Sequence, residues 1–137
     1  MIIRELVEQD IPAVLEIWRL AELNLGLSDT PDELKRFLRK NPTTSLVGEV
    51  GGRPVAAVLG GFDGRRGLVH HLAVLPEMQG GGYGKALMRE LEERFRQMHV
   101  VKINFWVEAR NLDVATFYEQ LGYQKRNLLT MSKVLRP

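Results

Sequence analysis

A glycine-rich stretch, Gln79-Gly80-Gly81-Gly82-Tyr83-Gly84-Lys85, lies between a predicted strand and an amphipathic helix. The N-terminus of a helix leaves several backbone N–H groups without partners and carries partial positive charge. Glycines let the backbone approach an anion closely and adopt a positive φ at little steric cost. Lys85 adds a cation nearby. The stretch is therefore predicted to bind a phosphate or pyrophosphate, and a flexible glycine turn is the plain alternative.

Two other glycine-rich motifs fit this loop less well. A Walker loop requires Ser or Thr after its Gly-Lys pair, but Ala86 follows Lys85. A Rossmann fingerprint should open the first strand–helix–strand unit and be followed by an acidic residue at the end of the next strand. Here the loop comes past the middle of the chain, although Glu108 does end the next predicted strand. The missing Ser or Thr after Lys85 therefore argues against a Walker loop more strongly than the position of the loop argues against a Rossmann fingerprint.

The composition is typical of a small globular protein. The chain has 137 residues, 45% hydrophobic and 26% charged, which suits one domain covering residues 1–137. No apolar run is long enough to span a membrane, and the N-terminus lacks the layout of a signal peptide. We therefore expect no membrane association.

Cysteine is absent and the net charge is only +2. The first fact excludes disulfides, thiolate metal sites and a cysteine nucleophile, and it fits a cytoplasmic protein. No metal site is expected. Basic and acidic residues alternate without a basic block, so nucleic-acid binding is not expected either. A mildly basic surface suits an anionic small molecule.

The first part of the chain is predicted to form one strand and two helices. Residues 2–6 form a short apolar strand. Asp10 can cap the helix that follows, with Pro12 in its first turn. A second helix starts at Thr30, a good N-cap, with Pro31 at the first helical position.

The rest of the chain alternates between strands and helices. Strands 45–50 and 55–62 are joined by Gly51-Gly52, which is a hairpin signal. The further elements are a turn at 63–67, a strand at 68–74, a helix at 84–97, a strand at 102–108, a helix at 114–121 and one or two closing strands at 123–135. This order predicts an α/β (α+β) fold with a mixed sheet of about six or seven strands, largely antiparallel with a central parallel pair, and helices on both faces.

Two segments of this sequence resemble the GNAT superfamily of acetyl-CoA-dependent N-acetyltransferases. Gln79, Gly82 and Gly84 match the Q/R-x-x-G-x-G/A motif of that family, and His71 to Glu77 resembles its central strand. A second match comprises Asn111, Ala115, Phe117-Tyr118 and Leu121-Gly122-Tyr123. The likeness covers residues 2–133 and is specific over 70–123. The chain looks most like the small YpeA-like acetyltransferases and, more distantly, the RimI-like enzymes.

The resemblance implies where acetyl-CoA (CoA) binds. The cofactor would fit where the parallel strands 68–74 and 102–108 separate, with the pantetheine arm pairing like an added strand. Asn111 would bond the pantetheine side, and Tyr118 would approach the thioester sulfur. The implied cofactor residues are Leu72, Ala73, Val74, Gln79, Gly80, Gly81, Gly82, Tyr83, Gly84, Lys85, Asn111 and Tyr118.

Acetyl transfer to an amine requires a neutral amine, a stabilised thioester oxygen and a proton for the leaving thiolate. By family likeness, a backbone N–H near Val74 is the donor to that oxygen and Tyr118 is the acid. The alternative for Tyr118 is a half-buried aromatic residue on a helix. Transfer would be direct to a primary amine of a small molecule or a protein N-terminus, without a covalent enzyme intermediate.

The general base is open between several groups. His70 and His71 should face opposite sides of a regular strand, unless a family bulge reverses them. His70 is preferred because some arylalkylamine acetyltransferases carry histidine at the similar position. Glu108 is the rival, with a solvated charge as its plain alternative, and a water chain is a third choice. RimI-like enzymes place a glutamate where this chain has Trp106, so their base does not transfer.

The acceptor site is expected against the two early helices, as is usual in the family. Trp18 and Leu27, with Leu23 and Leu25, are candidate wall residues, although core packing is the common role of an aromatic at helical spacing. Asp63 could attract a cationic amine, but Asp-Gly is first a turn signal. Exposed strands near the C-terminus could support a homodimer. An acyl-CoA-binding sensor with little catalysis and a simple nucleotide binder are the alternative functions.

Overall fold

The computed structural model describes residues 1–108 and 112–136. By its internal contacts the chain divides into two units, residues 1–104 and residues 105–137. The first unit contains the sheet and three of the α-helices found in the described residues, and the second contains the last α-helix and the C-terminal tail.

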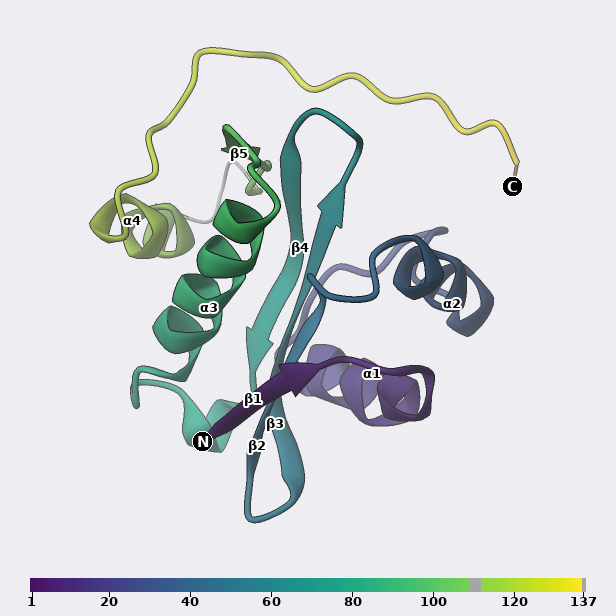
Figure 1. Cartoon of the computed structure of the whole chain (residues 1–137), viewed down its shortest axis with the longest axis vertical. Helices are drawn as coiled ribbons and strands as arrows, with labels where there is room; N and C mark the ends of the chain where they lie inside the picture. Colours follow the sequence, from purple (N-terminus) through teal and green to yellow (C-terminus); the bar gives the residue numbers. More distant parts are fainter. Residues whose placement is uncertain (109–111, 137) are drawn as a thin grey trace. The chain divides into compact units, whose positions relative to one another are not determined.

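Five strands within the described residues form one sheet in the order β1-β2-β3-β4-β5 (Figure 1). They are β1 (Ile2–Glu5), β2 (Leu46–Val50), β3 (Arg53–Phe62), β4 (Gly67–Val74) and β5 (Ile103–Asn104). Neighbours from β1 to β4 run antiparallel, and β4 pairs with β5 in parallel. The predicted mixed sheet, antiparallel at first with a parallel pair, is confirmed.

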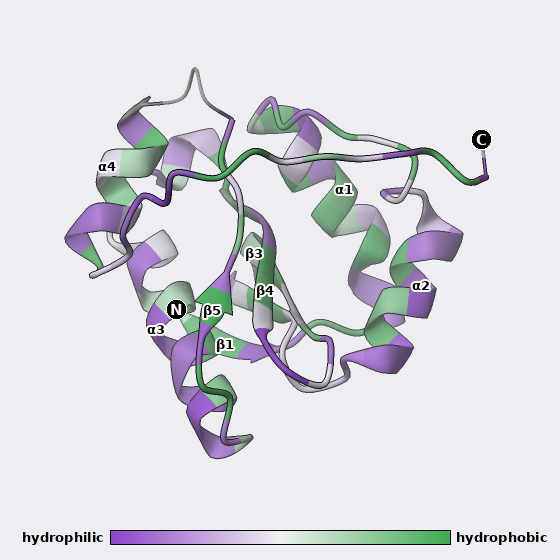
Figure 2. Ribbon diagram, turned by 90° about the horizontal axis from the view of Figure 1, so that it is seen from above, coloured by the Kyte–Doolittle hydropathy of each residue, from purple (hydrophilic) through white to green (hydrophobic). Residues whose placement is uncertain are grey.

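Helices cover both faces of this sheet. In Figure 1, α1 (Ile11–Leu20) and α2 (Pro31–Lys40) lie on one side and α3 (Tyr83–Gln97) lies on the other. Two short 3₁₀ turns, η1 (Glu8–Asp10) and η2 (Pro76–Met78), precede α1 and α3. Figure 2 shows that α1 is mostly hydrophobic and α2 mostly hydrophilic, because α1 packs more of its surface into the core.

The core consists of two apolar layers, one on each side of the sheet. Val14, Ile17 and Trp18 of α1 are almost fully buried. On the other side Leu87, Met88, Leu91 and Phe95 of α3 are equally buried. Burying a side chain of this size contributes about 1.5–3 kcal/mol, so these faces supply much of the folding free energy.

Local signals place several element boundaries correctly. Gly51 and Gly52, which connect β2 to β3, have φ of +58° and +78°, the left-handed values that a two-residue hairpin turn requires. At the start of α2, the Thr30 hydroxyl accepts a hydrogen bond from the Glu33 amide at 3.3 Å, and Pro31 is the first helical residue. Both predictions are confirmed.

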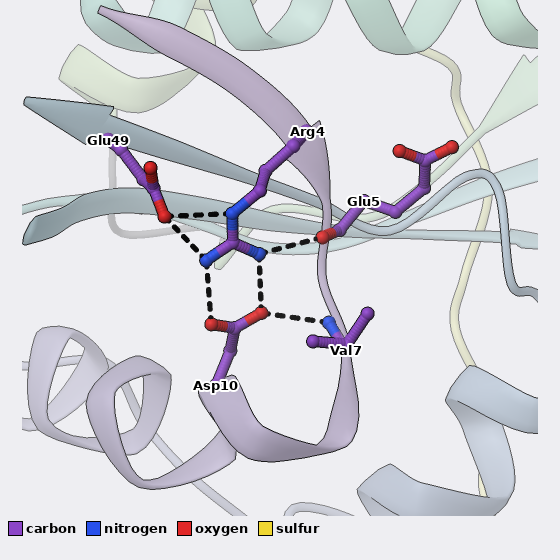
Figure 3. A network of polar contacts seen from close by, with 5 residues as sticks. All are labelled: Arg4, Glu5, Val7, Asp10 and Glu49. Atoms are coloured by element: carbon purple, nitrogen blue, oxygen red, sulfur yellow. Dashed lines mark hydrogen bonds and ion pairs between the residues drawn. The ribbon is translucent and has the colours of Figure 1, made fainter. Parts of the chain in front are cut away.

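Asp10 precedes α1 as predicted, but its side chain does not cap that helix. Its carboxylate instead accepts from Arg4 Nη1 and Nη2, at 2.7 and 2.8 Å (Figure 3). It also accepts from the Val7 amide at 2.9 Å. A two-pronged bond to a guanidinium is stronger than a neutral cap, which explains why the carboxylate turns toward the sheet.

The second unit holds α4 (Leu112–Gln120), followed by Gly122 with φ of +97°. Around the buried Tyr118 ring, the rings of Phe105, Phe117 and Tyr123 have centroids 4.5, 5.1 and 5.7 Å away. Of the predicted strand 102–108, only Ile103 and Asn104 pair with β4, through Gly67 and Leu68.

The C-terminal prediction was wrong. Among the described residues 123–136 there is no strand, so the sheet has five strands rather than six or seven. A strand requires both a pairing edge and a face to bury. The large apolar side chains of this segment lie exposed instead; they are Leu128, Leu129, Met131, Val134 and Leu135. None of the helices in the described residues has the length and hydrophobicity to span a bilayer.

Candidate functional site

The glycine loop turns directly into the first residue of α3. Gly82 is the N-cap of α3 and Gly80 lies two residues before it, and both have φ of +83°. Residues with side chains rarely adopt this backbone conformation, so glycine is favoured at both positions. The loop is exposed, and the first amides of α3 have no acceptor within the helix. The residues present therefore fit an anionic group at this helix end.

Gln79 fixes the loop to the end of β4. Its side-chain Nε2 donates to the Val74 carbonyl at 3.0 Å, and its backbone N–H donates to the Pro76 carbonyl at 3.3 Å. Lys85 is exposed on the first turn of α3. The structure thus brings the predicted pyrophosphate residues, 79–85, next to the predicted pantetheine residues, 72–74, because only the short turn η2 separates them.

The edge of β4 that faces β5 is paired over only two residues. Gly67 pairs with Ile103 and Leu68 with Asn104. Beyond Leu68, residues 69–74 have no strand neighbour on that side in the described chain. An open edge of this kind can accept an extended ligand through main-chain hydrogen bonds. The predicted pantetheine partners lie on it.

A β-bulge interrupts β4 at the two histidines. Ala57 of β3 pairs with Ala73, whereas Leu59 pairs with His70, so Val58 lies opposite both His71 and Leu72. His71 has φ of +53°, a left-handed value within a strand. The extra residue rotates the chain, and both histidine side chains border one pocket on the side of α1 and α2. Opposite facing was expected only for a regular strand, and the bulge, which was the stated alternative, brings both histidines to the same pocket.

This pocket has a volume of about 530 Å³ and lies between α2 and the sheet. His70 and His71 of β4 and Leu59 of β3 line its sheet side. The other lining residues come from α2 and the segments beside it, namely Ser28, Asp29, Glu33, Leu34, Arg36, Phe37, Arg39, Lys40 and Asn41. The pocket thus combines an apolar wall with charged groups and two imidazoles.

The two histidines have different surroundings. His71 Nε2 lies 2.8 Å from Asp29 Oδ1, and its ring centroid is 4.8 Å from that of Trp18. His70 meets the ring of Phe37 edge-on at 5.9 Å. Burial lowers the pKa of His70, and its neighbour His71 lowers it further. His70 is therefore neutral at neutral pH.

Sequence reasoning missed Asp29. Its Oδ2 accepts from the Gly26 amide at 2.7 Å while Oδ1 faces His71, so the carboxylate is held from two sides. One signal could have pointed to it: two capping residues, Asp29 and Thr30, precede Pro31, and the helix uses only Thr30. The residues around Asp29 do not indicate that it contacts His71, because the two are 42 residues apart in the sequence.

The predicted acceptor residues are not gathered in the pocket. Trp18 is fully buried and packs under the His71 ring. Leu27 is exposed in the loop before α2 and does not line the pocket. Asp63 is exposed in the turn after β3, where its Oδ1 accepts from the Arg65 and Arg66 amides at 2.7 Å each. These bonds lower the pKa of Asp63, as expected for a turn-stabilising carboxylate.

The remaining candidates belong to the second unit. Tyr118 is buried on α4, and burial raises its pKa to about 12, so its phenol stays protonated at neutral pH. Glu108 and Trp106 are exposed. Asn111 lies outside the described residues.

Comparison with known proteins agrees with this geometry. Residues 11–123 match the acetyltransferase (GNAT) family. An acetyltransferase of Pectobacterium atrosepticum is 34% identical over 135 residues, which cover 98% of this chain and 96% of that protein.

Two solved structures are similar in fold. One is the PaiA N-acetyltransferase of Thermoplasma acidophilum in complex with coenzyme A, with a TM-score of 0.82, 14% identity and coverage of 93% of this chain and 91% of that one. The other is the ribosomal-protein-S18-alanine N-acetyltransferase of Escherichia coli, with a TM-score of 0.76, 23% identity and coverage of 92% and 79%. The glycine loop on α3, the open edge of β4 and these likenesses agree, and the chain belongs to the GNAT family as an acetyl-CoA-dependent acetyltransferase.

Proposed function

We propose that this protein, as one domain over residues 1–137, transfers the acetyl group of acetyl-CoA directly to a primary amine of a small molecule or a protein N-terminus. The observation that carries the proposal is the continuity of the open β4 edge with the glycine loop on α3. When bound there, acetyl-CoA supplies an activated acyl group. The absence of cysteine agrees with transfer without a thiol intermediate on the enzyme, and with a cytoplasmic location.

In this proposal some residues of the chain bind acetyl-CoA, and Tyr118 donates a proton. Residues 79–85 hold the pyrophosphate through backbone N–H groups, and residues 72–74 hold the pantetheine arm, with Asn111 as a further partner. A backbone N–H near Val74 stabilises the thioester oxygen as charge develops on it. Tyr118 supplies a proton to the leaving sulfur, and its phenol is in the protonated form that a donor needs, because burial raises its pKa to about 12.

The proton acceptor for the amine comes from a short set of candidates. His70 borders the pocket and is neutral, as a base must be before it acts. Glu108 is exposed in the second unit. Both remain candidates from the sequence, and His71 joins them because the bulge turns it to the same pocket.

A pair of matched glycine variants tests the donor site. Gly82→Ala and Gly52→Ala each place a methyl group at a left-handed position, with φ of +83° and +78°, and neither new Cβ meets an atom within 4 Å. The backbone cost is about 1–2 kcal/mol in both. Titration calorimetry with CoA should show roughly tenfold weaker binding for Gly82→Ala and unchanged binding for Gly52→Ala. Equal affinities would remove the loop from the donor site.

A Tyr118→Phe variant tests the acid. Its kcat with acetyl-CoA and a good amine should fall by roughly 100-fold while CoA affinity stays at the wild-type value, because only the proton is removed. Unchanged turnover would exclude Tyr118 from this role. A wild-type protein that binds CoA but acetylates no member of a broad amine panel would point to an acyl-CoA sensor instead.

A further inference from the structure

We propose that the acceptor amine binds in the pocket between α2 and β4, and that His71, oriented by Asp29, takes the proton from its ammonium group. This rests on the proposed acetyl transfer and adds to it the proton acceptor and the residue that orients it. His71 would be the catalytic residue and Asp29 the positioning residue.

The first argument is the backbone of His71. Its φ of +53° lies in the left-handed region, which costs a non-glycine residue about 1–2 kcal/mol. Glycine would adopt the same bulge with less strain. Strained residues persist where surrounding contacts hold them and where the strain serves a site. Here the Asp29 bond and the Trp18 ring hold an imidazole at a position whose backbone conformation favours glycine.

The second argument is the way Asp29 orients the ring. An ionised carboxylate only accepts hydrogen bonds, so His71 Nε2 must carry the hydrogen in this 2.8 Å contact. The lone pair of the neutral ring then resides on Nδ1. No described residue hydrogen-bonds to Nδ1 of His71, and the residue borders the pocket. The Asp29 side chain is itself only 11% exposed and is fixed by Gly26.

The third argument is electrostatic. A carboxylate behind an imidazole stabilises the positive ring that forms when the ring accepts a proton. His70 does not compete for that proton, because burial and the neighbouring His71 lower its pKa. The other charged groups around the pocket lie on α2; they are Glu33, Arg36, Arg39 and Lys40. Arg36 pairs with Glu33 at 3.4 Å, and Arg39 pairs with Glu8 at 3.1 Å.

The proposed step moves one proton. An N–H bond of the ammonium group breaks and an N–H bond forms at His71 Nδ1, while Asp29 stays ionised. The nitrogen keeps the electron pair of the broken bond and becomes the neutral amine that acetyl transfer requires. The imidazolium then releases its proton to water through the open side of the pocket.

Three substitutions test the step by kinetics. His71→Gln and Asp29→Asn alter the pair, and His99→Gln is the matched control, because His99 is exposed after α3 and also has a left-handed φ, of +60°. The pH dependence of kcat/KM would be measured with acetyl-CoA and either phenethylamine or a peptide with N-terminal alanine. His71→Gln should lose roughly 100-fold in kcat/KM together with the histidine limb of the profile. Asp29→Asn should lose about tenfold and shift that limb to lower pH. His99→Gln should match the wild type.

A spectroscopic measurement on the ligand-free protein keeps the proposal testable if His71→Gln does not fold. Nitrogen NMR of protein labelled with ¹⁵N-histidine should show His71 as the Nε2–H tautomer, and Asp29→Asn should lose that preference. Addition of phenethylamine alone should shift the His70 and His71 signals and leave those of His99 in place. An Nδ1–H tautomer at His71 would overturn the proposal.

The outcomes separate the two levels of inference. Wild-type turnover that persists in His71→Gln with the same pH profile would overturn the role of His71 and leave acetyl transfer standing. A wild-type protein that binds no CoA by calorimetry, or that acetylates neither amine, would overturn both.

Discussion

Asp10 and Asp29 are held in the same local way on the same side of the sheet. Asp10 donates its amide to the Val7 carbonyl at 2.9 Å and accepts from the Val7 amide at the same distance. Asp29 repeats this exchange with Gly26, at 3.1 and 2.7 Å. Each residue precedes a helix, and each carboxylate also contacts a basic group on a strand: Asp10 with both oxygens, and Asp29 with Oδ1. The motif therefore anchors both α1 and α2 to the sheet.

The two anchors differ in the partner that the sheet supplies. Arg4 on β1 meets Asp10 with two nitrogens, while Nε donates to Glu49 at 2.8 Å and Nη1 to the Glu5 carbonyl at 2.9 Å. Figure 3 shows this closed network around a guanidinium that stays charged at any ordinary pH. His71 meets Asp29 with one nitrogen, carries a second ring nitrogen that can accept a proton, and borders a pocket. The first pair is suited to stability and the second to proton transfer.

The largest effect on kcat/KM should follow from replacing His71, the partner of Asp29, by arginine, which is the partner of Asp10. His71→Arg places a permanent cation opposite the carboxylate and removes a group that can accept a proton. We expect kcat/KM to fall by roughly 100-fold and its pH profile to lose the histidine limb, while the urea midpoint stays close to that of the wild type. Near-normal activity in this variant would mean that the Asp29 pair is only an anchor.

The next largest effect is expected on the free energy of unfolding, when the pair of Arg4 and Asp10 is changed. Asp10→Asn leaves the Arg4 guanidinium with a neutral partner and should lower the free energy of unfolding by about 2 kcal/mol. CoA affinity and the pH profile of kcat/KM should not change at a temperature where the variant is folded. Urea denaturation followed by circular dichroism checks the first part. Asp32→Asn, at an exposed carboxylate on the first turn of α2, is the control and should unfold like the wild type.

Acid should weaken the Asp10 anchor in a defined direction. Hydrogen bonding from Arg4 holds the pKa of Asp10 below its ordinary value, which is about 3.9 in an unfolded chain. The stability that this pair contributes is complete above the unfolded value and is lost as pH falls through the lower folded value. The wild-type urea midpoint should therefore drop more steeply below about pH 4 than that of Asp10→Asn. Parallel curves for the two proteins would contradict the pairing.

Features with local causes could be predicted from the sequence. Thr30-Pro31 starts α2, Gly51-Gly52 turns the first hairpin, and the glycines of 80–82 mark the start of α3. Each depends on backbone preferences of residues adjacent in the chain. Features that need a distant partner could not be predicted. The strand at 102–108 shortened to two residues, and 123–135 formed none, because pairing depends on an edge elsewhere in the fold.

The candidate site shows the same division. The loop and both histidines were identified from residue types, but the bulge that turns the histidines to one side has no signature in the adjacent residues. Asp29 was missed because its partner, His71, is 42 residues away. Asp10 was wrongly predicted to cap α1 because Arg4, on strand β1, binds its carboxylate instead. A sequence pattern identifies groups that can do chemistry, and tertiary contacts decide which of them meet.

The smallest effect is expected from a change at Thr30, next to Asp29. It tests whether the rate depends on how firmly α2 is held or on the Asp29 carboxylate. Thr30→Ala removes the hydroxyl that accepts from the Glu33 amide at 3.3 Å, and loss of such a cap costs about 1 kcal/mol of stability. Asp29 remains bonded to Gly26 and His71 in this variant, so the pH profile of kcat/KM should keep the wild-type limb. If the limb shifted as in Asp29→Asn, the rate would depend on the rigidity of the start of α2 and not on the carboxylate behind the imidazole. Asp29 would then serve stability, as Asp10 does, and would have no separate role in proton transfer.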